Sequence, residues 1–241
     1  MADPRRRRSV SRTFLLDLLD TQLGRLALGD TRALDVVDLG GGTGGLASSL
    51  AGQGHRVTVV DPSPDALASL ERRTAESGRV GQILGRQGDA ADLVELVGRH
   101  QADLVVCHRV LEVVDSPSEA LAAMAIVLRP GGVLSLLVSQ RHSVVLTQAL
   151  AGHIALARRT YADPSRFDHD QVLALVEAAH FTVLASHGIG AVADHVPEAL
   201  IDSEPGNYAA LVELESEISQ DPAFRALAPA VHVFAQANHR A

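Results

Sequence analysis

The chain has 241 residues, of which 46% are hydrophobic, 21% are charged and 3% are aromatic, and its formal net charge is −8. These values predict a globular domain of ordinary to large size and argue against a surface that binds nucleic acid through overall charge or broad base stacking. No apolar run approaches the roughly 18–20 residues needed to cross a bilayer. One cysteine, Cys107, excludes an internal disulfide framework and a cysteine-rich zinc site, and its apolar surroundings predict a buried, inert thiol.

The N-terminal segment is basic and then helical. Arg5–Arg8 form the one dense basic cluster, and Arg12 follows in an amphipathic helix expected near residues 10–28. We interpret the cluster as a solvated arm or as a contact to phosphate or another anionic ligand. The segment has neither a long apolar core nor a small-residue cleavage site, so it does not resemble a signal peptide. We therefore expect a cytoplasmic protein with no membrane and no disulfide-linked partner; its oligomeric state is unknown from the sequence.

The first half of the chain alternates short apolar strands with helices. Strands are predicted at residues 33–39, 55–61, within 80–89, 102–108 and 133–139. The helix after the second strand begins at Ser63-Pro64, and the helix after the fourth begins at the capping box Ser116-Pro117-x-Glu119. Pro130-Gly131-Gly132 is expected to break the chain before the fifth strand. Continuous Val, Leu and Ile runs separated by helices are typical of a parallel sheet covered on both faces.

The second half is less regular. We expect residues 141–168 to be helical and then loop-like, followed by a helix at 171–180, a strand at 181–189, a helix at 208–219, a turn from Pro222 and a last strand at 231–237. The last strand can pair antiparallel beside the sixth. The prediction is a single α/β domain over residues 1–241 with a Rossmann-like doubly wound sheet. Its parts are an N-terminal arm and helix (1–30), a cofactor-binding core (31–140) and helical substrate-side insertions (141–169 and 190–229).

A glycine-rich turn follows the first strand. In VVDLGGGTGG, Gly40-x-Gly42-x-x-Gly45 satisfies the G-x-G-x-x-G dinucleotide fingerprint. Such a turn lets a ligand approach the backbone at a helix N-terminus, which suits a pyrophosphate as well as the carboxylate end of S-adenosylmethionine. Asp38, two residues before Gly40, would repel a pyrophosphate but suits a ligand that carries an ammonium group. The turn therefore favours S-adenosylmethionine over a nicotinamide dinucleotide.

Acidic residues follow the next two strands. Asp61 ends the second strand, where a carboxylate can accept hydrogen bonds from ribose hydroxyls. Asp89 follows the third strand, where it can accept from an adenine amino group or serve as the N-cap of the next helix. The ribose contact is common to both ligands, whereas the adenine contact favours S-adenosylmethionine.

Together these motifs resemble the class I S-adenosylmethionine-dependent methyltransferases. VVDLGGGTG is similar to their first motif, VVDPSP to their strand-two acid, QGDAAD to their adenine-side motif and LRPGGVLSL to the start of their fifth strand. The resemblance implies a seven-stranded sheet of order 3-2-1-4-5-7-6 with strand 7 antiparallel, and S-adenosylmethionine at the carboxyl ends of the strands. The cofactor-binding residues that it implies are Arg12, Asp38, Gly40, Gly42, Gly44, Asp61, Pro62, Asp89, Ala90 and His108, and no metal site is expected.

Two further stretches bear on the methyl acceptor. The chain has no D/N-P-P-Y/F motif and no Pro-Cys dipeptide, which disfavours methylation of a base amino group and attack by a covalent cysteine. A similarity to the bacterial tRNA 5-carboxymethoxyuridine carboxyl methyltransferases and their actinobacterial relatives appears in two stretches, CHRVLEVVDSPSEALAAMAIVLRPGGVLSLLVSQRH and ALVELESEISQDPAFRALAPAVHVFAQ. That similarity implies a carboxylate acceptor, which is ionised at pH 7 and needs a cationic or polar clamp rather than a base. Candidate substrate residues are Arg109, Glu112, Arg141, Arg166 and Tyr208, and no catalytic residue is assigned.

The chain departs from that family after the sixth strand. Relatives have G-V-R-V-F there, with an arginine, whereas this chain has Gly188-Ile-Gly190-Ala-Val192. Gly190 cannot hold a carboxylate by charge. A small-molecule or natural-product acceptor is therefore the alternative to tRNA, and a non-catalytic cofactor-binding homologue is a further alternative.

Overall fold

The structure is a computed structural model that describes residues 9–27 and 32–238. The predicted basic arm, Arg5–Arg8, lies outside the described residues. The strands are β1 (Asp35–Leu39), β2 (Arg56–Asp61), β3 (Ile83–Gln87), β4 (Ala102–His108), β5 (Leu128–Ser139), β6 (Phe181–Ile189) and β7 (Ala230–Ala237). The longer helices are α1 (Val10–Leu26), α2 (Gly45–Gly52), α3 (Pro64–Glu76), α5 (Pro117–Val127), α6 (Arg141–Leu150), α7 (Ile154–Ala162), α8 (His169–Ala178) and α10 (Asn207–Ile218). Among the described residues, no helix is long and apolar enough to span a membrane.

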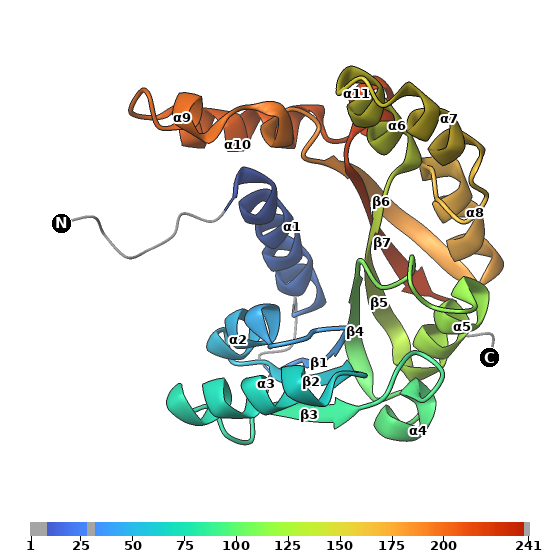
Figure 1. Ribbon diagram of the computed structural model, residues 1–241. Coiled ribbons are helices and arrows are strands. Elements are labelled where there is room, and N and C mark those ends of the chain that lie inside the picture. Colours follow the sequence, from blue (N-terminus) through green and yellow to red (C-terminus); the bar gives the residue numbers. More distant parts are fainter. Residues whose placement is uncertain (1–8, 28–31, 239–241) are drawn as a thin grey trace. The chain divides into compact units, whose positions relative to one another are not determined.

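The strands form one sheet of order β3-β2-β1-β4-β5-β7-β6 (Figure 1). The pairs β1–β2, β1–β4, β2–β3 and β4–β5 are parallel. The end of β7 lies beside the starts of its neighbours: the side-chain amide of Gln236 donates to the carbonyl of Gly131 at 3.1 Å, and the N–H of Asn238 donates to the carbonyl of His180 at 2.9 Å. The seven-stranded order with an antiparallel last strand is thereby confirmed.

The central strand β4 is almost wholly buried. Its residues from Ala102 to Cys107 are all buried, and the thiol of Cys107 is among them. Burial, followed by the charges of Glu112 and Asp38, raises the pKa of that thiol. The expected burial of this cysteine is confirmed, and a protonated, buried thiol is expected to be unreactive.

Helices cover the sheet as local signals predict. α2 and α3 pack against β2 and β3 (Figure 1). The hydroxyl of Ser63 accepts the N–H of Ala66 at 3.2 Å at the start of α3. The hydroxyl of Ser116 accepts the N–H of Glu119 at 3.4 Å at the start of α5. Both predicted helix starts are therefore formed, each with proline in the first turn.

The start of β5 differs from the expected break. β5 begins at Leu128, directly after α5, and continues through Pro130-Gly131-Gly132. Ala102 pairs with Leu128 but Leu104 pairs with Val133, so the intervening residues form a bulge within the strand. Arg129 anchors this bulge, because its guanidinium lies 2.9 Å from the carboxylate of Asp35. The prediction that Pro130-Gly131-Gly132 interrupts the chain before the strand is therefore wrong, because it did not take into account the ion pair between Arg129 and Asp35.

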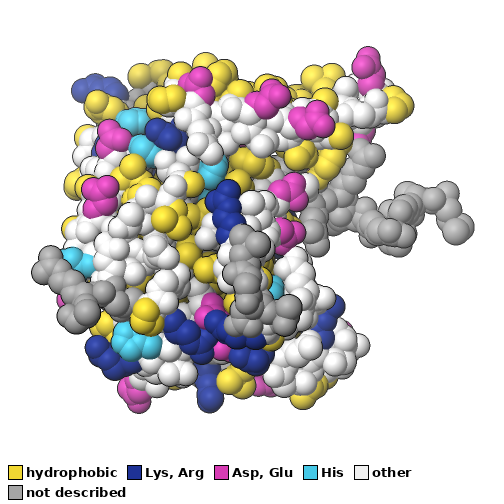
Figure 2. Space-filling view, turned by 180° about the vertical axis from the view of Figure 1, so that it is seen from behind, with side chains coloured by type: hydrophobic (Ala, Val, Ile, Leu, Met, Phe, Trp, Pro, Cys, Tyr) yellow, Lys and Arg dark blue, Asp and Glu magenta, His cyan; other side chains and the backbone are white. Residues whose placement is uncertain are grey.

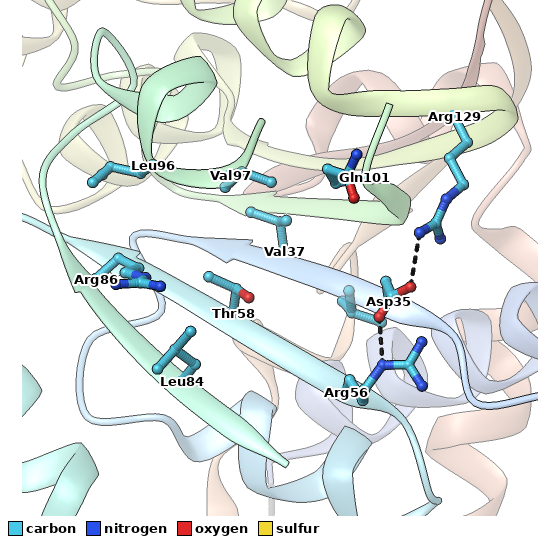
Figure 3. A pocket seen from close by; sticks show the side chains of 11 residues that line it. Asp35, Val37, Arg56, Thr58, Leu84, Arg86, Leu96, Val97, Gln101 and Arg129 are labelled. Atoms are coloured by element: carbon cyan, nitrogen blue, oxygen red, sulfur yellow. Dashed lines mark hydrogen bonds and ion pairs between the residues drawn. The ribbon is translucent and has the colours of Figure 1, made fainter. Parts of the chain in front are cut away.

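A cleft of about 230 Å³ lies over β1, β2 and β3 on the side of α4 (Leu93–Val97) (Figure 3). Val37, Thr58 and Leu84 are register neighbours, so their side chains share one face of the sheet. α4 has only five residues and leaves part of that face open, so Leu84 is 48% exposed. At one end of this cleft the carboxylate of Asp35 binds Arg56 and Arg129, as Figure 3 shows.

Internal contacts divide the chain into two compact units, which are described separately. One holds α1 up to Arg25 with residues 139–169 and 186–232, and the other holds residues 26–138, 170–185 and those from 233 onward. In the first unit, the segment expected to be loop-like contains α7. The same unit holds α10 and three short elements, the 3₁₀ helix η1 (Ala193–His195), α9 (Glu198–Ile201) and α11 (Pro222–Leu227).

The chain contains no lysine, so the dark-blue side chains of Figure 2 are arginines. On the face shown, they lie among acidic and apolar side chains.

Candidate functional site

The glycine turn joins β1 to α2. Gly40 adopts φ +72°, and a Cβ built on it would lie 2.3 Å from Cγ2 of Val110. Both the left-handed conformation and the contact with Val110 require glycine. The turn therefore lies directly against the segment that follows β4.

Asp61, at the end of β2, holds this turn in place. Its Oδ2 accepts the N–H of Gly42 at 2.9 Å, and its Oδ1 accepts the N–H of Ser63 at 2.9 Å. Each carboxylate oxygen has a second lone pair, and Asp61 also lines the large cleft described below. The carboxylate is therefore fixed in orientation and still able to accept hydrogen bonds from a ligand.

Asp38, in β1, is a buried carboxylate beneath the same turn. It is 4% exposed, and its Oδ2 lies so close to the backbone of Gly41 that a Cβ there would be 2.5 Å away. Within the described residues, this Oδ2 has no hydrogen-bond partner. Burial, followed by the charge of Asp61, raises the pKa of Asp38 to about 7. A buried acid without a donor fits a ligand that brings an ammonium group.

Asp89 follows β3 in the turn before α4, and the N-cap of α4 is Asp92, so the prediction that Asp89 caps this helix is wrong. Its Oδ1 accepts the N–H of Ala91 at 2.7 Å, and its own N–H donates to Oδ2 of Asp92 at 3.1 Å. The carboxylate thus closes the turn that precedes α4. Asp89 is also exposed and lines the cleft, so it retains lone pairs for a ligand.

A cleft of about 690 Å³ brings many of the predicted cofactor residues together. This volume lies within the range of cofactor and small-molecule sites. The predicted residues that line it are Gly40, Asp61, Pro62, Asp89, Ala90 and Arg109. The other lining residues, which were not predicted as site residues, are Leu39, Ala91, Val110, Val113, Val114, Asp115, Ser116, Glu119, Ala120 and Ala123. Most of these follow β4 or lie on α5, where the sequence indicated a helix start and a family resemblance but no cofactor contact.

Three candidates cluster at the end of β4. Nε2 of His108 lies 2.9 Å from the hydroxyl of Ser135, and His108 is not part of the cleft lining. Arg109 adopts φ +58°, a left-handed conformation uncommon outside glycine, and its N–H donates to the carbonyl of Leu137 at 2.7 Å. Glu112 is half-buried near Cys107. Among the described residues, no group of His, Cys, Asp and Glu is arranged to hold a metal ion.

The remaining candidates belong to the other compact unit. Arg12 is exposed in the first turn of α1. The hydroxyl of Tyr208 lies 2.6 Å from that of Thr13, which ties α10 to α1. The guanidinium of Arg141 lies 2.5 Å from the carboxylate of Asp168.

Arg166 makes a looser ion pair in the same unit, at 3.6 Å from the carboxylate of Asp163. Arg141 and Arg166 therefore each have an acidic partner within the chain. Of the three arginines proposed for an acceptor, Arg109 is the one that lines the cleft.

Comparison with known proteins identifies the chemistry of this cleft. Residues 37–136 match the family described as "Methyltransferase domain", a span that includes the glycine turn, Asp61 and Asp89. The chain is 29% identical over 211 residues to the tRNA 5-carboxymethoxyuridine methyltransferase of Escherichia coli O157:H7, covering 84% of this chain and 80% of that protein. The protein is an S-adenosylmethionine-dependent methyltransferase. Its cofactor is S-adenosylmethionine, as the glycine turn and its acids predict.

Two further comparisons place this methyltransferase among its relatives. It is 36% identical to a ubiquinone biosynthesis O-methyltransferase from Burkholderia multivorans, but over 105 residues, 44% of this chain and 43% of that protein. The crystal structure of the plantazolicin methyltransferase BamL in complex with SAH has the same fold, with a TM-score of 0.62 and 14% identity over 95% of this chain and 86% of that one.

One buried acid of the methyltransferase was not foreseen. Glu215 is fully buried on the inner side of α10, together with the half-buried Tyr208, Leu211 and Ile218. The spacing of these four positions places them on one helical face. A glutamate on the more apolar face of an amphipathic helix is an anomaly that the sequence does display.

Proposed function

We propose that this methyltransferase transfers a methyl group to a carboxylate oxygen, and that the acceptor is the oxyacetate of 5-carboxymethoxyuridine in tRNA. The observation that carries this proposal is the length of the similarity to the Escherichia coli enzyme. Its 211 aligned residues are more than twice the span of the matched methyltransferase domain, so the similarity extends into the insertions. The match to the ubiquinone enzyme, by contrast, extends over half that length. A tRNA acceptor would place the enzyme in the cytoplasm.

The cleft residues account for cofactor binding. We infer that Asp61 accepts hydrogen bonds from ribose hydroxyls, Asp89 accepts from the adenine amino group, and Asp38 binds the ammonium group. The same proposal assigns the backbone of Gly40 and Gly42 to close approach of the ligand. When bound, S-adenosylmethionine supplies a methyl group on a sulfonium sulfur, which is a good leaving group.

The acceptor needs alignment more than activation. A carboxylate is already ionised at pH 7, so this chain has no proton to remove from it. Arg109 lines the cleft and its backbone conformation is fixed by the hydrogen bond to Leu137. We infer that its guanidinium orients the acceptor carboxylate by charge and hydrogen bonds.

A small-molecule acceptor is the second candidate. It is favoured by Gly190, which has no side chain at a position where the resemblance to the tRNA enzymes implies an arginine. If Arg109 does not replace that arginine, the site would suit a different nucleophile. The acceptor assay separates the two candidates.

The test uses the purified protein and S-adenosylmethionine tritiated on the methyl group. Three pools are offered: tRNA that carries 5-carboxymethoxyuridine, an unmodified tRNA transcript, and a small-molecule extract. We expect label in the modified tRNA alone, released as methanol by mild base because the product is an ester. Label confined to the extract would overturn the tRNA proposal, and base-stable label would overturn carboxylate methylation.

Arg109→Ala provides an internal check on the acceptor site. It should raise the acceptor KM about tenfold or more, because a charged hydrogen bond contributes roughly 1.5–3 kcal/mol. The affinity for S-adenosylhomocysteine should be unchanged within about twofold if the guanidinium contacts the acceptor alone. An equal loss in both measurements would assign Arg109 to the cofactor instead.

A further inference from the structure

The smaller cleft, of about 230 Å³, is separate from the cofactor cleft. The two clefts have no described lining residue in common, although both belong to the compact unit that holds residues 26–138. The smaller cleft is lined by Asp35 and Arg56, the first residues of β1 and β2, whereas the cofactor cleft lies at the carboxyl ends of these strands. None of the residues proposed for the cofactor or the acceptor lines the smaller cleft, so methyl transfer does not account for it.

The surface inside the smaller cleft is mainly apolar. Val37, Thr58 and Leu84 are register neighbours on one face of the sheet and form its floor. Leu96 and Val97, at the end of α4, form a wall above this floor, as Figure 3 shows. Leu84 is 48% exposed, because α4 leaves part of the floor uncovered. An apolar group that filled the cleft would remove this surface from water, which is favourable.

Arg86, on β3, places a positive charge at one end of the cleft. Figure 3 shows its guanidinium beside Leu84 and Leu96, at the end away from Asp35. Leu84 and Arg86 are two residues apart on the same strand, so their side chains lie on the same face of the sheet. Within residues 9–27 and 32–238, no hydrogen bond or ion pair holds Arg86. Its planar fork of N–H donors is therefore available to a ligand.

The charges at the other end of the cleft are already paired. Asp35 lies 2.6 Å from the guanidinium of Arg56 and 2.9 Å from that of Arg129. Arg129 also lies 2.8 Å from the carboxylate of Asp103. The described lining holds three arginines and one acid, and Arg86 is the arginine whose charge is not compensated. The cleft therefore attracts an anion locally, although the chain as a whole has a net charge of −8.

We propose that the smaller cleft is a second ligand site and that it binds a small amphipathic carboxylate, an acid with an unbranched apolar body. The carboxylate accepts two parallel hydrogen bonds from Arg86, and the body lies over Val37, Leu84 and Val97. The volume of about 230 Å³ equals that of roughly eight water molecules in the liquid, which suits a body of about five carbons. A carboxylate fits better than a phosphate, because one guanidinium balances one negative charge and Asp35 would repel a second.

The test is a titration of the full chain with hexanoate, followed by two-dimensional ¹H–¹⁵N NMR. Two control ligands separate charge from apolar contact: 1-hexanol keeps the length of the body without the charge, and acetate keeps the charge with four fewer methylene groups. Each titration is repeated with saturating S-adenosylhomocysteine, which keeps the cofactor site filled. The variant Arg86→Gln is compared with Arg72→Gln, because Arg72 is an exposed arginine on α3.

We expect hexanoate to shift the amide signals of Leu84, Arg86, Val97 and Gln101 along one saturable curve, with or without S-adenosylhomocysteine. Acetate should bind about 100-fold more weakly, because each methylene group that leaves water contributes about fourfold in Kd. 1-Hexanol should bind about tenfold or more weakly, because it has no charge for the guanidinium. Arg86→Gln should weaken hexanoate binding to the same extent, and Arg72→Gln should match the wild type.

Shifts that do not saturate, or that spread over the whole surface, would show nonspecific binding and overturn the proposal. Competition by S-adenosylhomocysteine would assign hexanoate to the cofactor site instead. Equal affinity of the wild type and Arg86→Gln would remove the proposed role of Arg86. Leu84→Gln is the second variant, which keeps the charge but makes the floor more polar. It should weaken hexanoate binding and leave acetate binding unchanged, and an unchanged hexanoate affinity would also contradict the proposal.

Discussion

Asp38 lies buried under the glycine turn beside Asp61, and this pairing determines how the cofactor cleft responds to pH. Burial first, and the charge of Asp61 second, raise the pKa of Asp38 to about 7. Asp61 itself is bound by the N–H groups of Gly42 and Ser63. Two neighbouring acids thus have different environments, one bound by donors within the chain and one with an oxygen that lacks any donor among the described residues.

Cofactor affinity should rise with pH through neutrality. Below about pH 7 Asp38 is protonated, so binding an ammonium group must displace that proton. The affinity for S-adenosylhomocysteine should therefore fall by up to about tenfold per pH unit below pH 7. Isothermal titration calorimetry in buffers of different ionisation enthalpy should detect the released proton. In Asp38→Asn this proton release should be absent, and its persistence would assign it to another group.

The stability of the cofactor-free protein should show the opposite trend. The folded-state pKa of Asp38 lies above the value of 3.8 for the free side chain. Between about pH 4 and pH 7 the unfolded chain is ionised while the folded chain keeps the proton, so rising pH favours unfolding. Asp38 should lower the free energy of unfolding by about 1.4 kcal/mol per pH unit in this range. Urea titrations of wild type and Asp38→Asn check this: equal pH slopes would contradict it.

Asp61→Ala should remove most of the cofactor affinity. The substitution deletes the proposed ribose contact and also frees the N–H of Gly42, which loosens the glycine turn. A loss of about 2–3 kcal/mol, or roughly 30- to 150-fold in Kd, is expected from hydrogen bonds to a charged group. Thermal-shift titration with S-adenosylhomocysteine measures it, and NAD should produce no shift in the wild type. Asp65→Ala, an exposed acid on α3, is the matched control.

Gly40→Ala should weaken both the fold and the cleft. The new methyl group would meet Val110, and φ +72° costs an L-residue about 1–2 kcal/mol. Adding Val110→Ala removes the steric contact but leaves the backbone strain, so it should recover stability in part. Urea unfolding of the single and double variants separates the two effects. Full recovery in the double variant would show that the contact alone requires glycine.

Asp103→Asn should destabilise the end of the sheet where β1 and β4 begin, which is opposite to the glycine turn. Asp103 accepts two hydrogen bonds from Arg32, one from the N–H of Asp35, and an ion pair from Arg129. Burial acts to raise its pKa, but the bonds from Arg32, Asp35 and Arg129 outweigh it and lower the pKa to about 2.

The folded-state pKa of Asp103 lies below its unfolded value, so its stabilising contribution is complete above about pH 4 and is lost as pH falls through about 2. We expect a loss of about 1–3 kcal/mol at pH 7, since both charged partners are partly exposed. Urea unfolding at pH 7 and at pH 2 should show this difference shrinking in acid. A constant difference would rule out the charge of Asp103 as its cause.

The parts of the fold and site that depend on local signals could be predicted from the sequence. Asp38, Asp61 and Asp89 each follow or end an apolar strand, and strand ends are well marked by their neighbours. Ser63 and Ser116 begin helices because their hydroxyls reach the first free N–H groups. These interactions join residues a few positions apart.

The features that were not predicted depend on distant contacts. The bulge at Arg129 exists because this side chain reaches Asp35 and Asp103, far away in the sequence. The N–H of Gly190 donates a hydrogen bond to the carboxylate of Glu215, which lies 25 residues further along the chain. The sequence spacing of these residues does not indicate that they interact, because the fold determines which distant side chains come into contact.

The rate at which Cys107 reacts with a thiol reagent should report how often the sheet around it opens. The thiol is enclosed in β4 between β1 and β5, so a maleimide can reach it when the middle of the sheet separates. The rate of labelling therefore counts those openings, with no engineered probe and no second thiol to confuse the signal. A ligand that binds the folded form should slow the labelling, which turns one unreactive side chain into a screen for the unknown acceptor.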